Sequence, residues 1–185
     1  MSQGELLARI TGWLDDAEIK QSFASSFHGE PRTTRDIDIV IDPSAESLRR
    51  FVRSLQEADF YVDSGAALDA LAERTSFNVI ELATGWKVDL LVRQDRPFSR
   101  AEFDRRIRAG LLGADAYVAT VEDTIIAKLE WAVAGESERQ FRDVASILAV
   151  NGNTLDYVYI QRWVAALDLV DAWERVKPTD ESPDR

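Results

Sequence analysis

The sequence predicts an α/β domain followed by a helical C-terminal portion, and three observations lead to this fold class. Apolar residues recur at helical spacing over residues 6–14. Two apolar runs, residues 76–82 and 86–92, flank the turn signal "ATG" and predict a β-hairpin. From residue 121 to residue 176, one helical pattern follows another. Strands alternate with helices only in the first part of the chain.

Periodicity, caps and breakers place the remaining elements in order. Asp15 and Asp16 end the first helix, and Ser22 is suited to cap a short helix that Gly29 closes. Further helices are expected from Pro43 to about Ala58, over 66–74, after Phe98, and over 121–134, 136–150, 155–166 and 169–176. Strands are expected over 17–21, 36–41, 76–82 and 86–92, with a strand pair about Gly113.

Composition and charge exclude several classes of protein. The absence of cysteine and the single histidine, His28, exclude thiolate metal sites and disulfides and argue against a histidine triad, so any metal must be held by oxygen. A net charge of −11 argues against a general nucleic-acid binder. The N-terminus lacks the apolar core of a signal peptide, and no segment approaches about 18 uncharged apolar residues. A cytoplasmic protein without a membrane partner is expected.

Two aspartates stand one residue apart at the start of the strand "DIDIVID". Side chains alternate along a strand, so Asp36 and Asp38 share one face while the isoleucines occupy the other. Their Cα atoms lie roughly 6.6 Å apart, which allows both carboxylates to bind one hard cation. The alternative is that Asp36 ends a turn and Asp38 is merely solvated.

A third carboxylate occupies a similar position in "WKVDLLV". The apolar alternation there leaves Asp89 on one face with Lys87 and Leu91. Three carboxylates on neighbouring strands form a site for two divalent ions that clamp a phosphoryl group and activate a hydroxyl. The alternative for Asp89 is an ion pair with Lys87 or an exposed edge position.

The segment "SFASSFHGEPRTTRDIDIVID" resembles the first motif of the nucleotidyltransferase fold, in which a Gly-Ser turn opens a short helix and DxD begins the next strand. The small bacterial nucleotidyltransferases of the AbiEii and MenT toxin type are the closest resemblance. The later segment "EDTIIAKLEWAVAGESERQFRDVASIL" is similar to a helical pair of that family. The resemblance covers about residues 18–150 and implies a mixed β-sheet flanked by helices.

The resemblance assigns roles to individual residues. It implies metal binding and catalysis by Asp36, Asp38 and Asp89, phosphate binding by Ser22, and functional roles for Lys128 and Asp143. Arg32 and Arg35 are candidates to clamp nucleotide phosphates, or simply balance the aspartates.

From spacing alone, other interpretations of these residues stay open. Lys128 flanks a buried stripe, and a plain surface lysine is the alternative. Asp143 stands four residues after Arg139, which permits an ordinary helical ion pair. His28 fits a loop or capping residue better than a base.

One residue departs from the family pattern. Gln21 stands where the family usually has glycine before the serine. Glycine allows the backbone to approach a triphosphate closely, and the hypothesis is that the glutamine side chain obstructs that approach.

The resemblance implies an Mg²⁺-dependent transfer of a nucleoside monophosphate from a nucleoside triphosphate to an acceptor hydroxyl. Two ions are expected, with Mn²⁺ as an alternative metal. Expected acceptors are the 3′ end of tRNA, a protein or a small molecule, and an antitoxin is an expected partner if the protein is a toxin. The alternatives are an inactive binding component and a phosphatase of the haloacid dehalogenase kind, although in that class the aspartates follow the apolar strand.

The resemblance, the helical patterns and the polar, proline-bearing C-terminal segment together predict a division of the chain. The expected parts are a nucleotidyltransferase core at residues 1–120, a helical portion at 121–176 packed on that core, and a disordered tail at 177–185.

Overall fold

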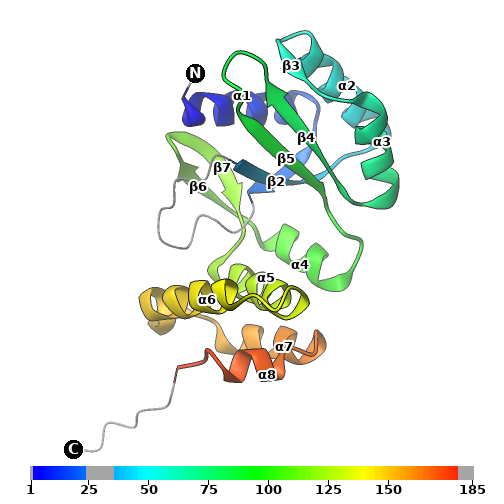
Figure 1. The fold of residues 1–185 in the computed structure, drawn as a ribbon. Coiled ribbons are helices and arrows are strands. Elements are labelled where there is room, and N and C mark those ends of the chain that lie inside the picture. The colour runs from blue at the N-terminus through cyan, green and yellow to red at the C-terminus, as the bar shows by residue number, and fades with distance from the viewer. Residues whose placement is uncertain (1, 24–35, 179–185) are drawn as a thin grey trace, which may run out of the picture. The chain divides into compact units, whose positions relative to one another are not determined.

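The computed structural model describes residues 2–23 and 36–178, with the side chain of Asp36 excepted (Figure 1). The chain divides between Ala119 and Thr120 into two compact units, called unit 1 and unit 2 below. The predicted disordered tail falls largely on residues 179–185, which lie outside the described residues.

Unit 1 is built on a seven-stranded mixed sheet with the strand order β3-β4-β5-β2-β1-β7-β6. The strands are β1 (Lys20–Phe23), β2 (Asp36–Asp42), β3 (Phe60–Tyr61), β4 (Ser76–Glu81), β5 (Lys87–Val92), β6 (Ile107–Leu111) and β7 (Ala114–Val118). The β2–β5 and β1–β7 pairs are parallel, and the other pairs are antiparallel. The predicted α/β class with a mixed sheet is confirmed.

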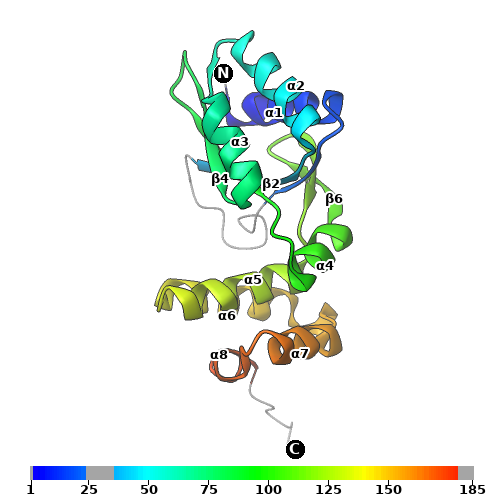
Figure 2. The ribbon, with the colours of Figure 1, turned by 90° about the vertical axis from the view of Figure 1, so that its right-hand side faces the viewer.

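The helices of unit 1 are α1 (Gln3–Asp16), α2 (Ala45–Gln56), α3 (Ser64–Glu73) and α4 (Pro97–Arg105). Ser44 starts α2 with a capping box, because its hydroxyl accepts the N–H of Ser47 and the Ser47 hydroxyl accepts the N–H of Ser44. Helices α1, α2 and α3 gather on one side of the sheet in two perpendicular views (Figures 1 and 2).

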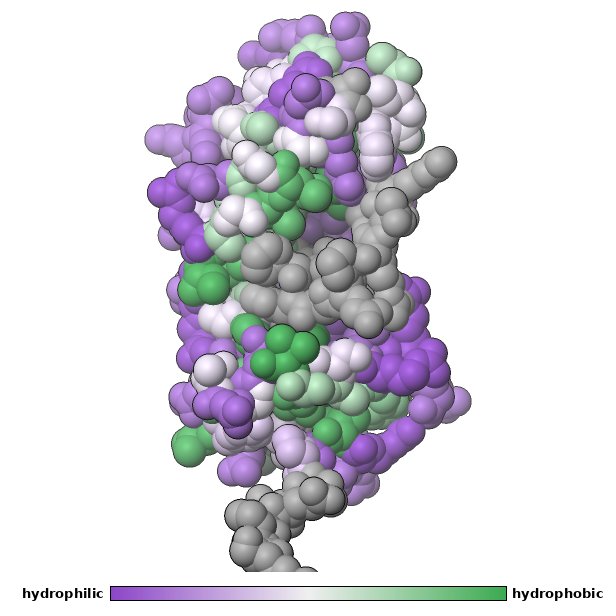
Figure 3. All heavy atoms as spheres, turned by 90° about the vertical axis from the view of Figure 1, so that its left-hand side faces the viewer, coloured by the Kyte–Doolittle hydropathy of each residue, from purple (hydrophilic) through white to green (hydrophobic). Residues whose placement is uncertain are grey.

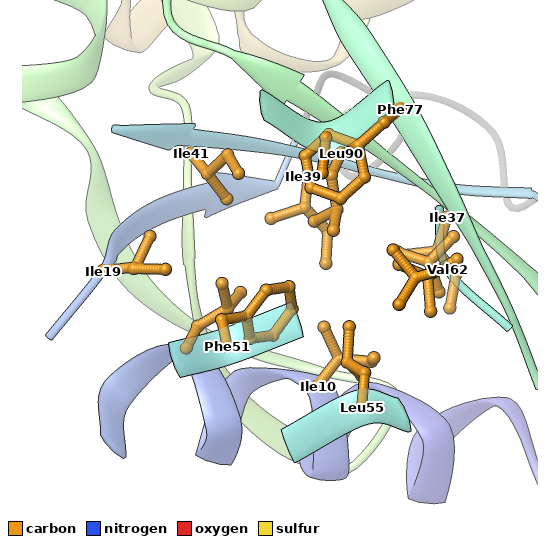
Figure 4. Packing of buried hydrophobic residues seen from close by; sticks show 14 of the residues in the cluster. Ile10, Ile19, Ile37, Ile39, Ile41, Phe51, Leu55, Val62, Phe77 and Leu90 are labelled. Atoms are coloured by element: carbon orange, nitrogen blue, oxygen red, sulfur yellow. The ribbon is translucent and has the colours of Figure 1, made fainter. Parts of the chain in front are cut away.

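The core of unit 1 lies between the sheet and these helices. Ile39 and Ile41 on β2 and Leu90 on β5 are fully buried and point toward Phe51 of α2 and Ile10 of α1 (Figure 4). Each fully buried aliphatic or aromatic side chain contributes about 1.5–3 kcal/mol relative to exposure. Since strand residues alternate, the residues between these buried ones face the opposite side of the sheet, which we call the open face.

The sequence placed most elements of unit 1 correctly. The predicted strand over 36–41, the hairpin of 76–82 with 86–92, and the strand pair about Gly113 are all present, with boundaries shifted by at most a residue or two where they were given. The two-residue strand β3 was not predicted, because two residues carry no periodic signal.

Ser22 is the main correction in unit 1. It lies inside β1, which spans Lys20–Phe23, and does not cap a helix. The strand begins at Lys20, three residues later than predicted, and extends past the predicted end at Gln21, because Gln21 and Phe23 alternate toward the core. The rest of that predicted helix, residues 24–27, lies outside the described residues.

Unit 2 consists of α5 (Val121–Ala134), α6 (Glu138–Asn151), the short 3₁₀ helix η1 (Gly152–Thr154), α7 (Tyr157–Ala166) and α8 (Val170–Glu174). The predicted helix at 121–134 is confirmed at both ends, and the later ones begin one or two residues late. Thr120 caps α5 by accepting the N–H of Asp123 at 3.2 Å.

Asp123 is a fully buried carboxylate at the start of α5. It accepts hydrogen bonds from the Thr120 hydroxyl at 2.6 Å and the Tyr159 hydroxyl at 2.6 Å. A buried charge is tolerated only when hydrogen bonds satisfy it, so this contact ties α7 to the first turn of α5.

The visible surface is predominantly hydrophilic and is interrupted by small hydrophobic areas (Figure 3). Scattered apolar side chains of this kind are normal on a folded protein. Within the described ranges, every helix is too short or too polar to cross a bilayer.

The β4–β5 hairpin is closed by the carboxylate of Glu81. The Thr84 hydroxyl donates to its Oε2, as does the Thr84 backbone N–H at 2.7 Å, and the Ala83 N–H donates to Oε1 at 3.3 Å. The hydrogen bond from the Thr84 side chain is the largest cause that lowers the pKa of Glu81 below its ordinary value of 4.5.

The hairpin clamp should therefore depend on pH. A carboxylate with a lowered folded-state pKa contributes stability that is complete above its unfolded pKa and is lost as the pH falls through the folded value. We expect Glu81→Gln to lower the melting temperature at pH 6 and to lower it progressively less as the pH falls below 4.5. Thermal melts of both proteins across that range measure this, and a difference that stays constant with pH would contradict it.

Candidate functional site

Two carboxylates stand side by side on the open face of the sheet in unit 1. Asp38 of β2 is the direct register partner of Asp89 on the adjacent parallel strand β5. Neighbouring strands lie about 4.8 Å apart, and register partners project from the same face. Asp38 is exposed, and the Asp89 side chain retains 27% of its exposure. The two aspartates thus lie on neighbouring strands as predicted, and their metal-binding role stays a prediction.

This row of polar residues extends to the strands on either side. Asn78 of β4 is in register with Asp89 and is exposed, and no hydrogen bond of its amide is found among the described residues. On the other side, Ser22 of β1 is opposite Val40, which places it diagonally from Asp38, about 7–8 Å away, but unlike Asp38 it is only 4% exposed. The order across the open face is therefore Ser22, Asp38, Asp89 and Asn78.

Asn78 was not singled out from the sequence. The alternation of Phe77 and Val79 toward the core assigns Asn78 to the open face. Its position opposite Asp89 depends on the hairpin register, which the short turn closed by Glu81 sets. The length of this turn was the sequence signal that could have predicted the position of Asn78 beside Asp89.

Lys87 forms an ion pair with Asp89. Its Nζ lies 2.8 Å from Asp89 Oδ2, and the two side chains are 39% and 27% exposed. Lys87 and Asp89 are two residues apart on one strand, so both project from the open face. The ion pair that the sequence suggested as an alternative is therefore present. It does not exclude the other interpretation, that Asp89 belongs to a metal site, because Asp89 is also next to Asp38.

Asp36 begins β2 and is the register partner of Lys87, one pleat along from the Asp38–Asp89 pair. Its side chain, like Arg32, Arg35 and His28, lies outside the described residues, so their predicted roles stay predictions.

The donors that are described suit a hard divalent cation. Asp38 and Asp89 supply carboxylate oxygens and Asn78 an amide oxygen, which are the ligand types that Mg²⁺ and Mn²⁺ prefer. Among the described side chains, no group of three or more Asp, Glu, His or Cys residues converges, and the predicted third carboxylate, Asp36, stays a prediction. Asp42, the remaining acid on this face of β2, is paired with Arg93 at 3.1 Å.

Gln21 does not stand on the aspartate face. It is in register with Ile41, one of the core residues, and is 4% exposed. Its Oε1 is buried and has no hydrogen-bond partner among the described residues. The hypothesis that this side chain obstructs a triphosphate on the open face is therefore wrong, because strand alternation directs it into the core.

Lys128 and Asp143 meet within unit 2. Lys128 Nζ, on α5, lies 3.1 Å from Asp143 Oδ2 and 3.2 Å from Gln140 Oε1, both on α6. The lysine and aspartate side chains are only 11% and 18% exposed. Lys128 is therefore not a plain surface lysine. Gln140 was not predicted, and its position three residues before Asp143 on α6 was the available signal.

Comparisons with known proteins identify the fold. No protein-family profile matches the chain, and no curated protein matches it in sequence. Solved structures do match. A crystal structure of an antigenic nucleotidyltransferase-like protein from Paracoccidioides brasiliensis is 16% identical and aligns over 92% of this chain and 91% of its own, with a TM-score of 0.56.

Two further solved structures are similar in fold. ANT(2″)-Ia in complex with adenylyl-2″-tobramycin is 12% identical over 91% of this chain and 98% of its own, with a TM-score of 0.58. The lincosamide antibiotic adenylyltransferase LnuA, bound to lincomycin, is 13% identical over 80% of this chain and 96% of its own, with a TM-score of 0.51. The chain therefore has a nucleotidyltransferase fold. The finer resemblance to the AbiEii and MenT type stays a prediction.

The burial of Gln21 predicts the effects of two substitutions. Gln21→Leu keeps most of the volume and removes the unpaired oxygen, so stability should be equal or higher by up to about 1 kcal/mol. Gln21→Gly leaves a cavity within a strand and should cost about 2 kcal/mol or more. Urea unfolding of both variants measures this. A Gln21→Leu protein that is clearly less stable than the wild type would show that the amide makes a needed contact.

The ion pair in unit 2 predicts a contrast between two acids on α6. Asp143→Asn leaves the Lys128 ammonium nearly buried without a counter-charge and should cost about 1–3 kcal/mol. Glu138→Gln breaks the exposed pair with Arg175, which spans 2.9 Å, and should cost less than about 1 kcal/mol. Denaturant unfolding compares them directly, and equal costs would mean that the Lys128–Asp143 pair has no special contribution.

Proposed function

We propose that this protein is a metal-dependent nucleotidyltransferase that moves a nucleoside monophosphate from a nucleoside triphosphate to an acceptor hydroxyl. The observation that carries the proposal is the register match of Asp38 and Asp89 on adjacent parallel strands of a nucleotidyltransferase fold. The match puts two anionic oxygen donors beside each other on a face that is open to a ligand.

The residues of the row have separate roles in this proposal. Asp38, with Asp36, holds the divalent ions, and Asp89 completes one ion site. Bound Mg²⁺, or Mn²⁺ in its place, would neutralise the phosphate charge that develops during transfer. Ser22 and its neighbouring backbone amides hold the terminal phosphates, with Arg32 and Arg35 as further phosphate contacts. The nucleotide thus lies toward β1 and the acceptor toward β4.

The chemical step is an in-line displacement at the α-phosphorus. The acceptor oxygen forms a bond to that phosphorus while the bond to the bridging oxygen of the β-phosphate breaks, and pyrophosphate leaves with the bonding electrons. Asp89 accepts the proton of the acceptor hydroxyl. Asp89 is the carboxylate of the described pair that lies nearer to β4, where Asn78 can hold the acceptor by a hydrogen bond.

Lys128 and Asp143, both in unit 2, are further residues with a proposed functional role. An ammonium group has three donors, and the contacts to Asp143 and Gln140 use two of them. The third donor is suited to a phosphate oxygen, and Asp143 fixes the direction in which the lysine points. This assignment rests on the resemblance in sequence together with the observed ion pair.

A small hydroxyl-bearing molecule is the acceptor with the most direct support, because two of the structurally similar proteins are described with antibiotic-derived ligands. The 3′ end of tRNA and a protein side chain are the other acceptors to test. A tRNA or protein acceptor would favour a toxin whose partner is an antitoxin. An inactive binding component is the alternative function.

The experiment is to incubate the protein with each α-labelled nucleoside triphosphate, Mg²⁺, and panels of small-molecule, tRNA and protein acceptors. We expect labelled acceptor and released pyrophosphate with the wild type. Asp38→Asn and Asp89→Asn should each reduce transfer at least about a hundredfold, roughly 2.7 kcal/mol in the barrier, because each removes an anionic ligand and keeps the shape.

Asp115→Asn is the matched control. It removes one carboxylate from β7 of the same sheet, where Asp115 is exposed and paired with Arg108 at 3.4 Å. Its transfer rate should equal that of the wild type. Folded wild-type protein that labels no acceptor in any panel would favour the inactive binding component.

A further inference from the structure

The strongest unassigned contact on the open face is the ion pair of Lys87 with Asp89. Its Nζ–Oδ2 distance of 2.8 Å is that of a charge-assisted hydrogen bond. Both side chains are partly exposed, so water and ions can reach the contact. Lys87 is also the register partner of Asp36, so it lies beside that position on β2 and two residues before Asp89 on β5.

The position of Lys87 reduces the electrostatic repulsion between Asp38 and Asp89. Two carboxylates on register partners about 5 Å apart repel each other, and a cation beside them relieves the repulsion. The ammonium group of Lys87 is a cation supplied by the chain itself. It is bound to Oδ2 of Asp89, one of the two carboxylate oxygens with which this residue could bind a divalent ion.

We propose that Lys87 is a built-in counter-cation of the metal site, and that a divalent ion must displace it from Asp89 to bind. The inference rests on the metal site of the proposed function. It adds that Lys87 limits how tightly this site binds a divalent ion. The free protein keeps the site neutralised and binds divalent metal weakly. Displacement also frees the ammonium donor that Lys87 gives to Asp89, on the face where the polyphosphate is proposed to lie.

A second lysine on the same face provides a matched control. Lys20 of β1 is exposed and is the register partner of Asp42, which follows Asp38 by four residues along β2. At strand rise this is about 13 Å from the Asp38–Asp89 pair, beyond the Debye length of about 8–10 Å at ordinary ionic strength. Removing its charge alters the net charge of the protein by the same amount and leaves the row untouched.

The test is isothermal titration of Mg²⁺ into the wild type, Lys87→Met, Lys87→Arg and Lys20→Met, without nucleotide and after each protein has been shown to melt cooperatively. Lys87→Met should bind Mg²⁺ at least about tenfold more tightly than the wild type, because the competing cation is gone. Lys87→Arg, which keeps the charge, should bind as the wild type does. Lys20→Met should change the affinity by less than about threefold.

Unchanged or weaker Mg²⁺ binding by Lys87→Met would overturn the counter-cation role, and so would an equal gain in Lys20→Met, which would reduce the effect to net charge. If Lys87→Met binds Mg²⁺ more tightly and yet no variant transfers a nucleotide, the counter-cation role stands and the proposed transfer reaction fails. If neither the wild type nor Lys87→Met binds Mg²⁺ at millimolar concentrations, the metal site itself is refuted, and this inference with it.

Discussion

The parallel pairing of β2 with β5 is the constraint on which the candidate site depends. One register sets two faces at once. It buries Ile37, Ile39 and Ile41 beside Val88 and Leu90, and it holds Asp38 next to Asp89 on the other side. A slip of one residue would move carboxylates into the core, which is prohibitively costly, so the hydrophobic core enforces the geometry of the charged row. The stability of unit 1 and the arrangement of its polar face thus have a single origin.

The sequence predicted those features of the site that depend on neighbouring residues in the chain. It did not predict those that depend on contacts between distant segments. Strand alternation is local, and it assigned Asp38 and Asp89 to one face correctly. Asn78 depended on the pairing of two strands, which alternation alone does not fix. Ser22 was placed at a helix cap because serine favours caps, and burial of the neighbouring residues overrode that preference. The partner of Lys128 lies on another helix, so spacing along α5 carried no information about it.

Polar groups in the two units are protected by different means. On the open face of unit 1, Asp89 and its lysine partner remain partly exposed, and exchange of partners there is inexpensive because water solvates either state. In unit 2, Lys128 and Asp143 are nearly buried, so a rearrangement of that pair would leave a charge without solvation. The exposed Lys87–Asp89 pair is therefore suited to exchanging its partner for a ligand. The nearly buried Lys128–Asp143 pair is suited to holding its side chains in one orientation.

The buried carboxylate of Asp123 at the start of α5 connects two helices of unit 2 that are not consecutive in the chain. Asp123 accepts a hydrogen bond from Thr120, which caps its own helix, and another from Tyr159, which lies on α7. A chain that stopped after α6 would lose the hydrogen bond from Tyr159 to this buried carboxylate, so α7 contributes to the stability of the first turn of α5. The helices of unit 2 should consequently open and close as one cooperative segment, although each is short enough to fray if it stood alone.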